Sequence, residues 1–325
     1  MLRVSSIVSR LHVTWDSQSV RQSGSRSMSQ EEQMNREVSV AVLGLGAMGH
    51  AFADNLVAAG YRVSVWNRSP GKASDLVDKG ARLANSPAEA VAGCQAVITM
   101  LPDLDVTREV LMGHDGALGA MSSEAVLIQM GTLGVVETER LIDGVAAARG
   151  DVVFIDAPVS GTKAPAQQGS VSVLASGDRE RAGSLVEPIF DVLGAQTHWL
   201  GEAGQGARMK VVVNAWLIAM MQGIAETARL ADTQGIAPET LWSVLEGGPL
   251  AVPYMKGKLD AISGENFDPQ MALQWGLKDA GLALEAGRNT ALPSLSQIRN
   301  LWADAVDDGY AEQDIAAIYA YLKQR

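Results

Sequence analysis

The chain has 325 residues, 47% of them hydrophobic and 19% charged, so it carries enough apolar side chains to fill the cores of two domains. A formal net charge of −11 and a pI near 4.9 argue against a nucleic-acid-binding protein, because a phosphate backbone attracts a basic surface. Cys94 is the only cysteine, which excludes an intrachain disulfide and favours a reducing, cytoplasmic location.

Residues 1–36 differ in composition from the rest of the chain. They are rich in arginine and serine, and Asp16 is the only acidic residue before Glu31. We therefore expect a disordered N-terminal extension. Two origins stay open, an organelle transit peptide and an upstream extension that precedes a start at Met28 or Met34. The second is favoured, because the segment has no clear amphipathic stripe and no long apolar run.

A glycine-rich turn joins the first predicted strand, residues 40–43, to an alanine-rich helix that ends at Ala59. In dinucleotide-binding folds, the first glycine of such a pattern makes the tight turn and the second lets the backbone approach the pyrophosphate. The third glycine lets the helix pack on the strand, and the first amides of the helix face the phosphates. The predicted cofactor-binding residues of this turn are Gly44, Leu45, Gly46, Ala47, Met48 and Gly49.

The end of the second strand, residues 62–66, indicates which dinucleotide is bound. NAD sites normally have Asp or Glu here to bind the ribose hydroxyls, whereas this chain has Asn67, Arg68 and Ser69, followed by Lys72. Asn67 and Ser69 would hydrogen-bond a 2′-phosphate and Arg68 would neutralise it. The pattern therefore predicts NADP(H), with a solvated surface arginine as the alternative.

Strands and helices then alternate as a doubly wound sheet requires. Residues 96–101 and 125–130 are short β-rich runs typical of buried parallel strands, and three more strands are predicted over residues 152–155, 171–175 and 197–200. Because ligands of open α/β sheets bind at the carboxyl ends of the strands, we expect further cofactor contacts there. The residues concerned are Met100, Leu101, Pro102 and Thr132.

These elements predict an α/β fold in which a Rossmann-type, NADP-binding domain, residues 37–200, precedes an all-helical substrate and dimerisation domain, residues 201–325. One long helix, residues 206–233, would join the two. It is apolar nearly all round, through Met209, Val212 and Trp216 among others, so we expect it to be buried between the domains. Its longest apolar stretch is interrupted by polar residues and shorter than the roughly 20 residues of a membrane span, so none is expected.

Lys210 and Asn214 lie four residues apart on this helix and therefore share one face. A lysine on a buried helix is costly unless it is paired or catalytic, because desolvation penalises the ammonium group and lowers its pKa. Lys210 is thus a catalytic candidate. The alternative is a first-turn lysine whose ammonium group reaches the solvent.

Four ordered motifs resemble the β-hydroxyacid dehydrogenases, a family that includes 3-hydroxyisobutyrate dehydrogenase, tartronate semialdehyde reductase and the glyoxylate/succinic semialdehyde reductases. The resemblance runs from about residue 38 to residue 321. Its motifs are the 44–49 glycine loop, the 156–161 segment DAPVSG, the 201–214 helix start with Lys210 and Asn214, and Lys278-Asp279.

The resemblance implies roles for these residues. Ser160, Gly161 and Thr162 would hold a substrate carboxylate, Lys210 would be the general acid/base, Asn214 would orient it and Lys278 would reach the cofactor. The reaction would be hydride transfer between NADP(H) and a small aldehyde acid or hydroxy acid. The chain is most similar to the NADPH-dependent glyoxylate/succinic semialdehyde branch, although Gln129 and Thr162 depart from the family pattern.

Two other functions stay open. Imine reductases and reductive aminases are similar in fold and in the segment after the second strand, but they usually have Asp or Tyr where this chain has Lys210. A redox sensor that binds NADPH without turnover is the non-enzyme alternative. The four histidines, at positions 12, 50, 114 and 198, have no metal-ligand spacing, so no metal is expected. The apolar long helix predicts a homodimer or homotetramer formed through the helical domain.

Overall fold

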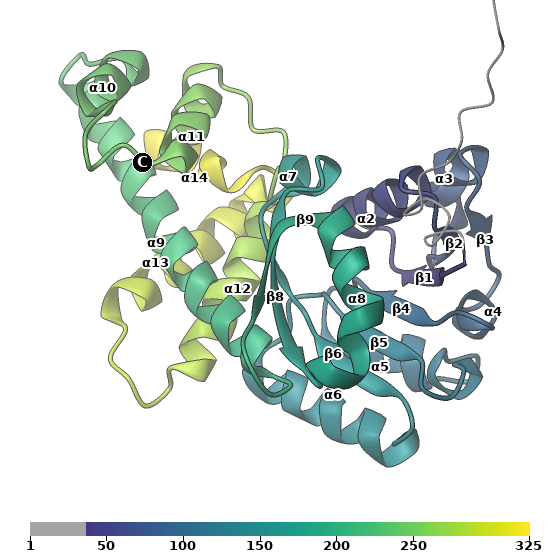
Figure 1. Ribbon diagram of the computed structural model, residues 1–325. Coiled ribbons are helices and arrows are strands. Elements are labelled where there is room, and N and C mark those ends of the chain that lie inside the picture. Colours follow the sequence, from purple (N-terminus) through teal and green to yellow (C-terminus); the bar gives the residue numbers. More distant parts are fainter. Residues whose placement is uncertain (1–36) are drawn as a thin grey trace, which may run out of the picture.

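The computed structural model describes residues 37–325, and the prediction made for residues 1–36 lies outside them. A sheet flanked by helices is followed in the sequence by a group of helices, and the long helix α9 (Gln205–Thr233) runs from the first part into the second (Figure 1). The predicted fold class is confirmed: a Rossmann-type doubly wound sheet, then an all-helical part, joined by a long helix.

The sheet has the strand order β3-β2-β1-β4-β5-β6-β8-β7, with β9 also paired to β8. From β3 to β6 all neighbours are parallel, which is the doubly wound order. The strands are β1 (Ser39–Leu43), β2 (Arg62–Trp66), β3 (Arg82–Leu83), β4 (Ala96–Thr99), β5 (Val126–Gln129), β6 (Val153–Asp156), β7 (Val159–Ser160), β8 (Val171–Gly177) and β9 (Gly194–Trp199).

The central strands form because their side chains are apolar on both faces. In β1, Val40 and Val42 join one buried cluster while Ala41 and Leu43 join another, so both faces of the sheet carry a core. The helices of this part are α2 (Ala47–Ala58), α3 (Ser74–Asp78), α4 (Pro87–Val91), α5 (Leu104–Met112), α6 (Val135–Ala148), α7 (Lys163–Gln167) and α8 (Arg179–Leu193). The carboxyl ends of β1, β4 and β5 therefore lie together at one edge of the sheet, between the helices that cover its two faces.

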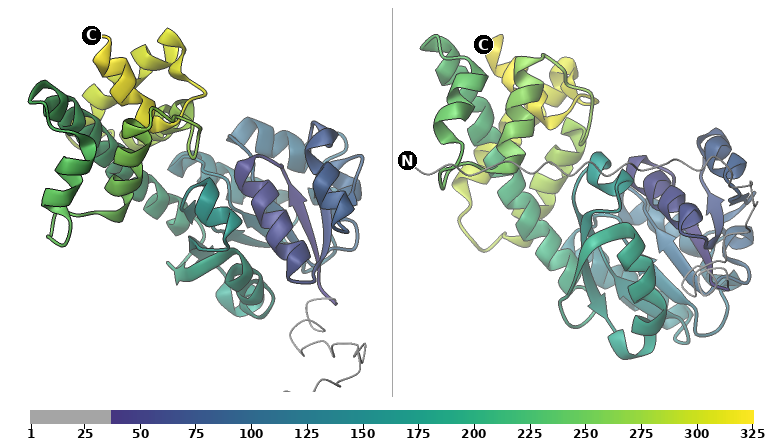
Figure 2. Two further views of the ribbon diagram at one scale, coloured as in Figure 1. Left: turned by 90° about the horizontal axis from the view of Figure 1, so that it is seen from above. Right: turned by 45° about the horizontal axis from the view of Figure 1, so that its top comes forward.

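The helical part packs around the C-terminal portion of α9, away from the sheet, and has its own core (Figure 2). Trp302 is fully buried in it, and a Cβ on Gly276 would lie 2.6 Å from the Trp302 ring, so the indole packs directly on the α12 backbone. The helices are α10 (Pro238–Leu245), α11 (Pro253–Ser263), α12 (Leu273–Ala286), α13 (Pro293–Ala305) and α14 (Ile318–Lys323).

The prediction that α9 is buried between the domains is wrong for one of its faces. Met209 is 40% exposed, and Val212 and Trp216 are each 65% exposed. Within residues 37–325, helices cover the opposite face of α9, which carries Lys210 and Asn214. By length and composition alone, α9 could cross a membrane, but a single such helix is weak support because core helices pass the same test.

The predicted strands are all present, with ends that shift by at most three residues. Two short strands, β3 and β7, were not expected, because two-residue runs carry no readable alternation. β8 runs antiparallel to β6, a reversal that the apolar run over 171–175 does not encode.

Candidate active site

The turn after β1 can be made only with glycines at two of its positions. Gly44 has φ +101°, and a Cβ there would lie 2.4 Å from the Met100 carbonyl oxygen. A Cβ on Gly49 would lie 2.0 Å from the Gly44 carbonyl oxygen, so α2 packs against the turn itself. Around Gly46, by contrast, a Cβ would meet no atom within 4 Å. Gly46 therefore leaves open space at the start of α2, where a ligand backbone could approach.

The N-terminus of α2 is free to bind an anion. Gly46 is the N-cap and provides no side-chain acceptor for the first-turn amides of Ala47, Met48 and Gly49. No acidic residue lies in that turn. Asn67 links the turn to β2, because its Oδ1 accepts a hydrogen bond from Leu45 N at 3.0 Å. This arrangement suits a pyrophosphate, and the assignment of these residues to the cofactor stays a prediction.

A cavity of about 400 Å³ opens beside this turn. It brings together six of the predicted cofactor residues, from the ends of β2 and β4: Asn67, Arg68, Ser69, Lys72, Leu101 and Pro102. Arg68 and Lys72 are exposed cations on one side, and Asp105 and Glu109 line it from α5. Its size and cationic rim fit the adenosine half of a dinucleotide phosphate.

The loops after β4 and β5 are tied together at the crevice. Lys278 on α12 donates from Nζ to the carbonyl oxygens of Pro102, at 2.9 Å, and Thr132, at 2.8 Å. Lys278 was predicted to contact the cofactor, and the structure places its ammonium group between two loops that form the crevice edge. Behind them, Gln129 bonds Thr99 and donates to the Gly131 carbonyl oxygen at 3.1 Å. Gln129 thus has a structural role in shaping this loop.

Lys210 lies on the buried face of α9 with 8% exposure, next to Asn214 with 2%. Asn214 donates from Nδ2 to Asp279 Oδ2 at 2.6 Å. The other carboxylate oxygen, Asp279 Oδ1, lies 3.7 Å from Lys278 Nζ and accepts no hydrogen bond from the described residues. Two lysines, an amide and a carboxylate therefore meet between α9 and α12.

Burial controls the charges in this group. It lowers the pKa of the Lys210 ammonium below its ordinary value, and Asp279 acts in the opposite direction. Burial also raises the pKa of the Asp279 carboxyl. A lysine with a lowered pKa gives up its proton more readily, which is what a general acid near neutral pH requires.

The predicted substrate loop faces α9. Ser160 ends β7, Gly161 has φ +144° and Thr162 is the N-cap of α7. This φ favours glycine, and a Cβ on Gly161 would also crowd the Val171 side chain at 3.0 Å. Because α9 contacts β7, the loop and the start of the helix bearing Lys210 are neighbours. The assignment of these three residues to the substrate stays a prediction.

Asp156 fixes the start of α9 to the sheet. Its Oδ2 accepts hydrogen bonds from Ala207 N at 2.8 Å and from Ser176 Oγ at 3.2 Å, and it is 1% exposed. Ser176 Oγ in turn accepts from Gly206 N at 2.9 Å. Burial raises the pKa of Asp156 to about 6. The carboxylate thus holds the first turn of the helix, three residues before Lys210.

Asp156 and Asp279 were not expected to have a role in the site, although both lie inside the motifs 156–161 and 278–279. Their signal was an acidic residue in an otherwise apolar stretch.

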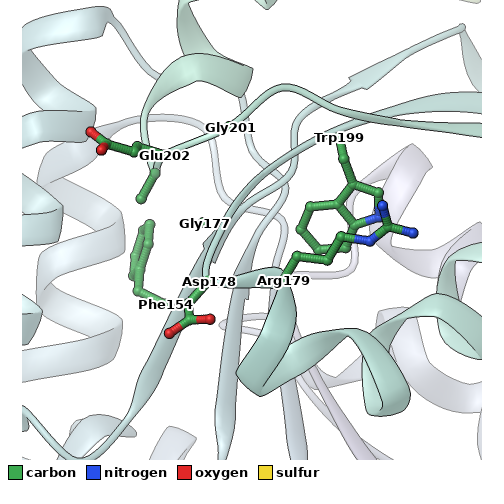
Figure 3. Close-up of a pocket in the computed structure, with 8 residues that line it drawn as sticks. Phe154, Gly177, Asp178, Arg179, Trp199, Gly201 and Glu202 are labelled. Carbon is green, nitrogen blue, oxygen red and sulfur yellow. The ribbon is translucent and has the colours of Figure 1, made fainter.

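A second, more open cavity of about 670 Å³ contains no predicted site residue (Figure 3). It lies at the ends of β6, β8 and β9, where the Arg179 Cζ atom lies 5.3 Å from the centroid of the Trp199 ring. Within residues 37–325, no group of three or more His, Cys, Asp or Glu side chains could hold a metal ion.

Two family models match the chain. Residues 39–201 match the NAD-binding domain of 6-phosphogluconate dehydrogenase, and residues 204–322 match a domain described as the NAD-binding domain of NADP-dependent 3-hydroxyisobutyrate dehydrogenase. Among curated relatives, glyoxylate/succinic semialdehyde reductase 1 of Arabidopsis thaliana is 33% identical over 286 residues, which are 87% of this chain and 98% of that protein.

Solved structures agree with this match. The Mycobacterium tuberculosis 3-hydroxyisobutyrate dehydrogenase with L-serine has a TM-score of 0.77 at 26% identity, over 88% of this chain and 99% of that one. An imine reductase from Pseudomonas sp. has a lower TM-score, 0.60, at 26% identity over the same shares. With both halves of the chain matched and a relative covered nearly end to end, this protein belongs to the β-hydroxyacid dehydrogenase family of NAD(P)-dependent oxidoreductases.

Proposed function

We propose that this protein is an NADPH-dependent reductase of small aldehyde acids, of the glyoxylate, succinic semialdehyde or 3-hydroxyisobutyrate type. The observation that carries the proposal is the buried Lys210, which shares a helix face with Asn214, interacts electrostatically with Asp279, and lies on the helix that contacts β7. A lysine so costly to bury is best explained by a catalytic role. The name of the Arabidopsis relative, a glyoxylate/succinic semialdehyde reductase, supports the same substrate class.

NADP(H) is the proposed cofactor. The end of β2 has no carboxylate to bind ribose hydroxyls, and Arg68, Ser69 and Lys72 line the cavity there. A 2′-phosphate would receive hydrogen bonds and positive charge from these residues. A bound nicotinamide supplies the hydride for the aldehyde carbon. The first-turn amides of α2 would hold the pyrophosphate.

The protein's own residues then divide the remaining work. Ser160, Gly161 and Thr162 hold the substrate carboxylate, which makes hydride transfer effectively unimolecular. Lys210 donates a hydrogen bond to the carbonyl oxygen and delivers its proton as negative charge develops there. Asn214, held by Asp279, orients substrate and lysine. Asp279 balances the positive charge of the two lysines in this buried group.

A substrate panel tests the proposal. Glyoxylate, succinic semialdehyde and methylmalonate semialdehyde are offered with NADPH, and 3-hydroxy acids with NADP⁺, while absorbance at the nicotinamide band is followed. Turnover of at least one aldehyde acid, faster than of neutral aldehydes of equal length, is expected. Turnover of neutral aldehydes alone would contradict the carboxylate-binding role of the 160–162 loop.

Two other functions predict different outcomes. An imine reductase would reduce cyclic imines but no aldehyde acid, and the buried lysine argues against it. An NADPH sensor would bind the cofactor without turnover and would not respond to Lys210→Ala.

A homo-oligomer is also proposed, because the exposed face of α9 carries Met209, Val212 and Trp216.

A further inference from the structure

The segment between α11 and α12 crosses from the helical part to the substrate loop. It runs beside α7, as Figure 1 shows. Its residue Gln270 accepts hydrogen bonds from the first two amides of that helix. Gln270 Oε1 accepts from Ala164 N at 3.1 Å, and the Gln270 carbonyl oxygen accepts from Lys163 N at 3.4 Å. These are the amides that follow Thr162 directly, and the first turn of a helix offers them no acceptor.

Gln270 is itself held from the core of the helical part. Asp314 Oδ2 accepts from Gln270 N at 2.9 Å and from Met271 N at 3.2 Å. Its Oδ1 accepts from Lys258 Nζ at 2.6 Å and from Ala316 N at 2.9 Å. Asp314 is 2% exposed and Lys258 is 7% exposed. The carboxylate thus receives four hydrogen bonds and fixes the conformation of the segment around Gln270.

These bonds form a continuous chain from the buried pair Lys258–Asp314, through Gln270, to the end of the substrate loop. Elsewhere the segment is held by the pairing of β7 with β8 and by Asn55 Nδ2, which donates to the Ala166 carbonyl oxygen at 2.8 Å. Neither contact provides an acceptor for the first amides of α7, and Ser160 and Thr162 are half-buried while Gly161 is exposed. Thr162, the N-cap of α7, provides no side-chain hydrogen bond to its first turn. Gln270 supplies acceptors from outside the helix.

We propose that Gln270 is a positioning residue for substrate binding: it fixes the start of α7 and so sets the 160–162 loop in the geometry that receives a carboxylate. The inference rests on the proposed function, in which that loop holds the substrate. Among residues 37–325, Gln270 has no hydrogen bond to the cofactor turn or to the group around Lys210, so its effect falls mainly on the affinity for the substrate and less on the chemical step.

Gln270→Met tests the proposal, because it keeps the length of the side chain and removes the acceptor. It should raise KM for the carboxylate substrate by about 5- to 30-fold, the effect of one lost hydrogen bond and a loosened loop. The expected changes in kcat and in NADPH affinity are both below about threefold. Gln274→Met is the matched control, since Gln274 Nε2 donates to Glu312 at 2.7 Å away from the loop.

Hydrogen exchange gives a second readout that needs no turnover. Exchange of the 160–168 segment should be faster in Gln270→Met, unchanged in Gln274→Met, and slow again in Gln270→Glu, which restores an acceptor oxygen for Ala164 N. Unchanged exchange in Gln270→Met, or faster exchange with an unchanged substrate KM, would overturn the proposal. If the wild type reduces no aldehyde acid, the proposed function fails. The role of Gln270 is then decided by the hydrogen-exchange result together with the KM of any other carboxylate substrate that the protein turns over.

Discussion

The buried carboxyl group of Asp156, which holds the start of α9, makes the stability of the protein depend on pH in a defined direction. Burial raises the pKa of Asp156 in the folded protein to about 6, against 3.8 in the unfolded chain. A carboxyl whose folded pKa is raised contributes most stability below its unfolded pKa and loses it as pH rises through its folded pKa. A difference of about 2 pKa units corresponds to about 3 kcal/mol in total. About 2 kcal/mol of this stabilisation is lost between pH 4 and pH 8.

Asp156→Asn removes the titration while keeping an oxygen that accepts from Ala207 N and Ser176 Oγ. The free energy of unfolding of the variant, relative to the wild type, should therefore rise by about 2 kcal/mol from pH 4 to pH 8. Urea unfolding at five pH values, followed by tryptophan fluorescence, measures it. Asp191→Asn removes the same charge from an exposed position on α8 and controls for net charge. Parallel pH profiles of Asp156→Asn and wild type would refute the reasoning.

Three further outcomes are expected. Turnover with NADPH should exceed turnover with NADH by at least ~10-fold in kcat/KM, and Arg68→Ala should reduce that ratio; equal values for the two cofactors in the wild type would contradict NADP(H) specificity. Gly46→Ala should fold normally and bind NADPH more weakly, whereas Gly49→Ala should lower thermal stability, because its Cβ would lie 2.0 Å from the Gly44 carbonyl oxygen; equal stability losses measured by thermal unfolding would argue against the different surroundings of the two glycines. Trp216→Glu should produce a smaller species than the wild type in light scattering, and a wild type that is already monomeric at micromolar concentration would contradict the proposed oligomer.

The sequence was sufficient for the sheet and the cofactor turn because both depend on local signals. Buried parallel strands are continuous apolar runs, and the steric demands at Gly44 and Gly49 come from residues of the turn and one neighbouring strand. The unusual position of Lys210 could also be predicted, since a lysine among apolar residues on a helix contradicts the local pattern. The antiparallel direction of β8 was not, because strand direction depends on how the chain returns to the sheet.

Contacts between residues far apart in the chain could not be read in this way. Gln270 bonds amides more than 100 positions earlier, and Asp279 meets Asn214 across two helices. The exposed face of α9 was missed for a related reason. An apolar side chain such as Val212 predicts burial, but the sequence does not say whether the burying partner lies in the same chain.

The central claim is that Lys210 protonates the forming alkoxide, and the kinetics of Lys210→Ala test it most directly. With an aldehyde acid and NADPH at saturation, kcat should fall by about 10²-fold to 10⁴-fold, while NADPH affinity measured by fluorescence stays nearly unchanged. Lys210→Arg should restore little activity, because a guanidinium group does not readily give up a proton. A Lys210→Ala protein that keeps near wild-type kcat on every aldehyde acid reduced by the parent would contradict the account.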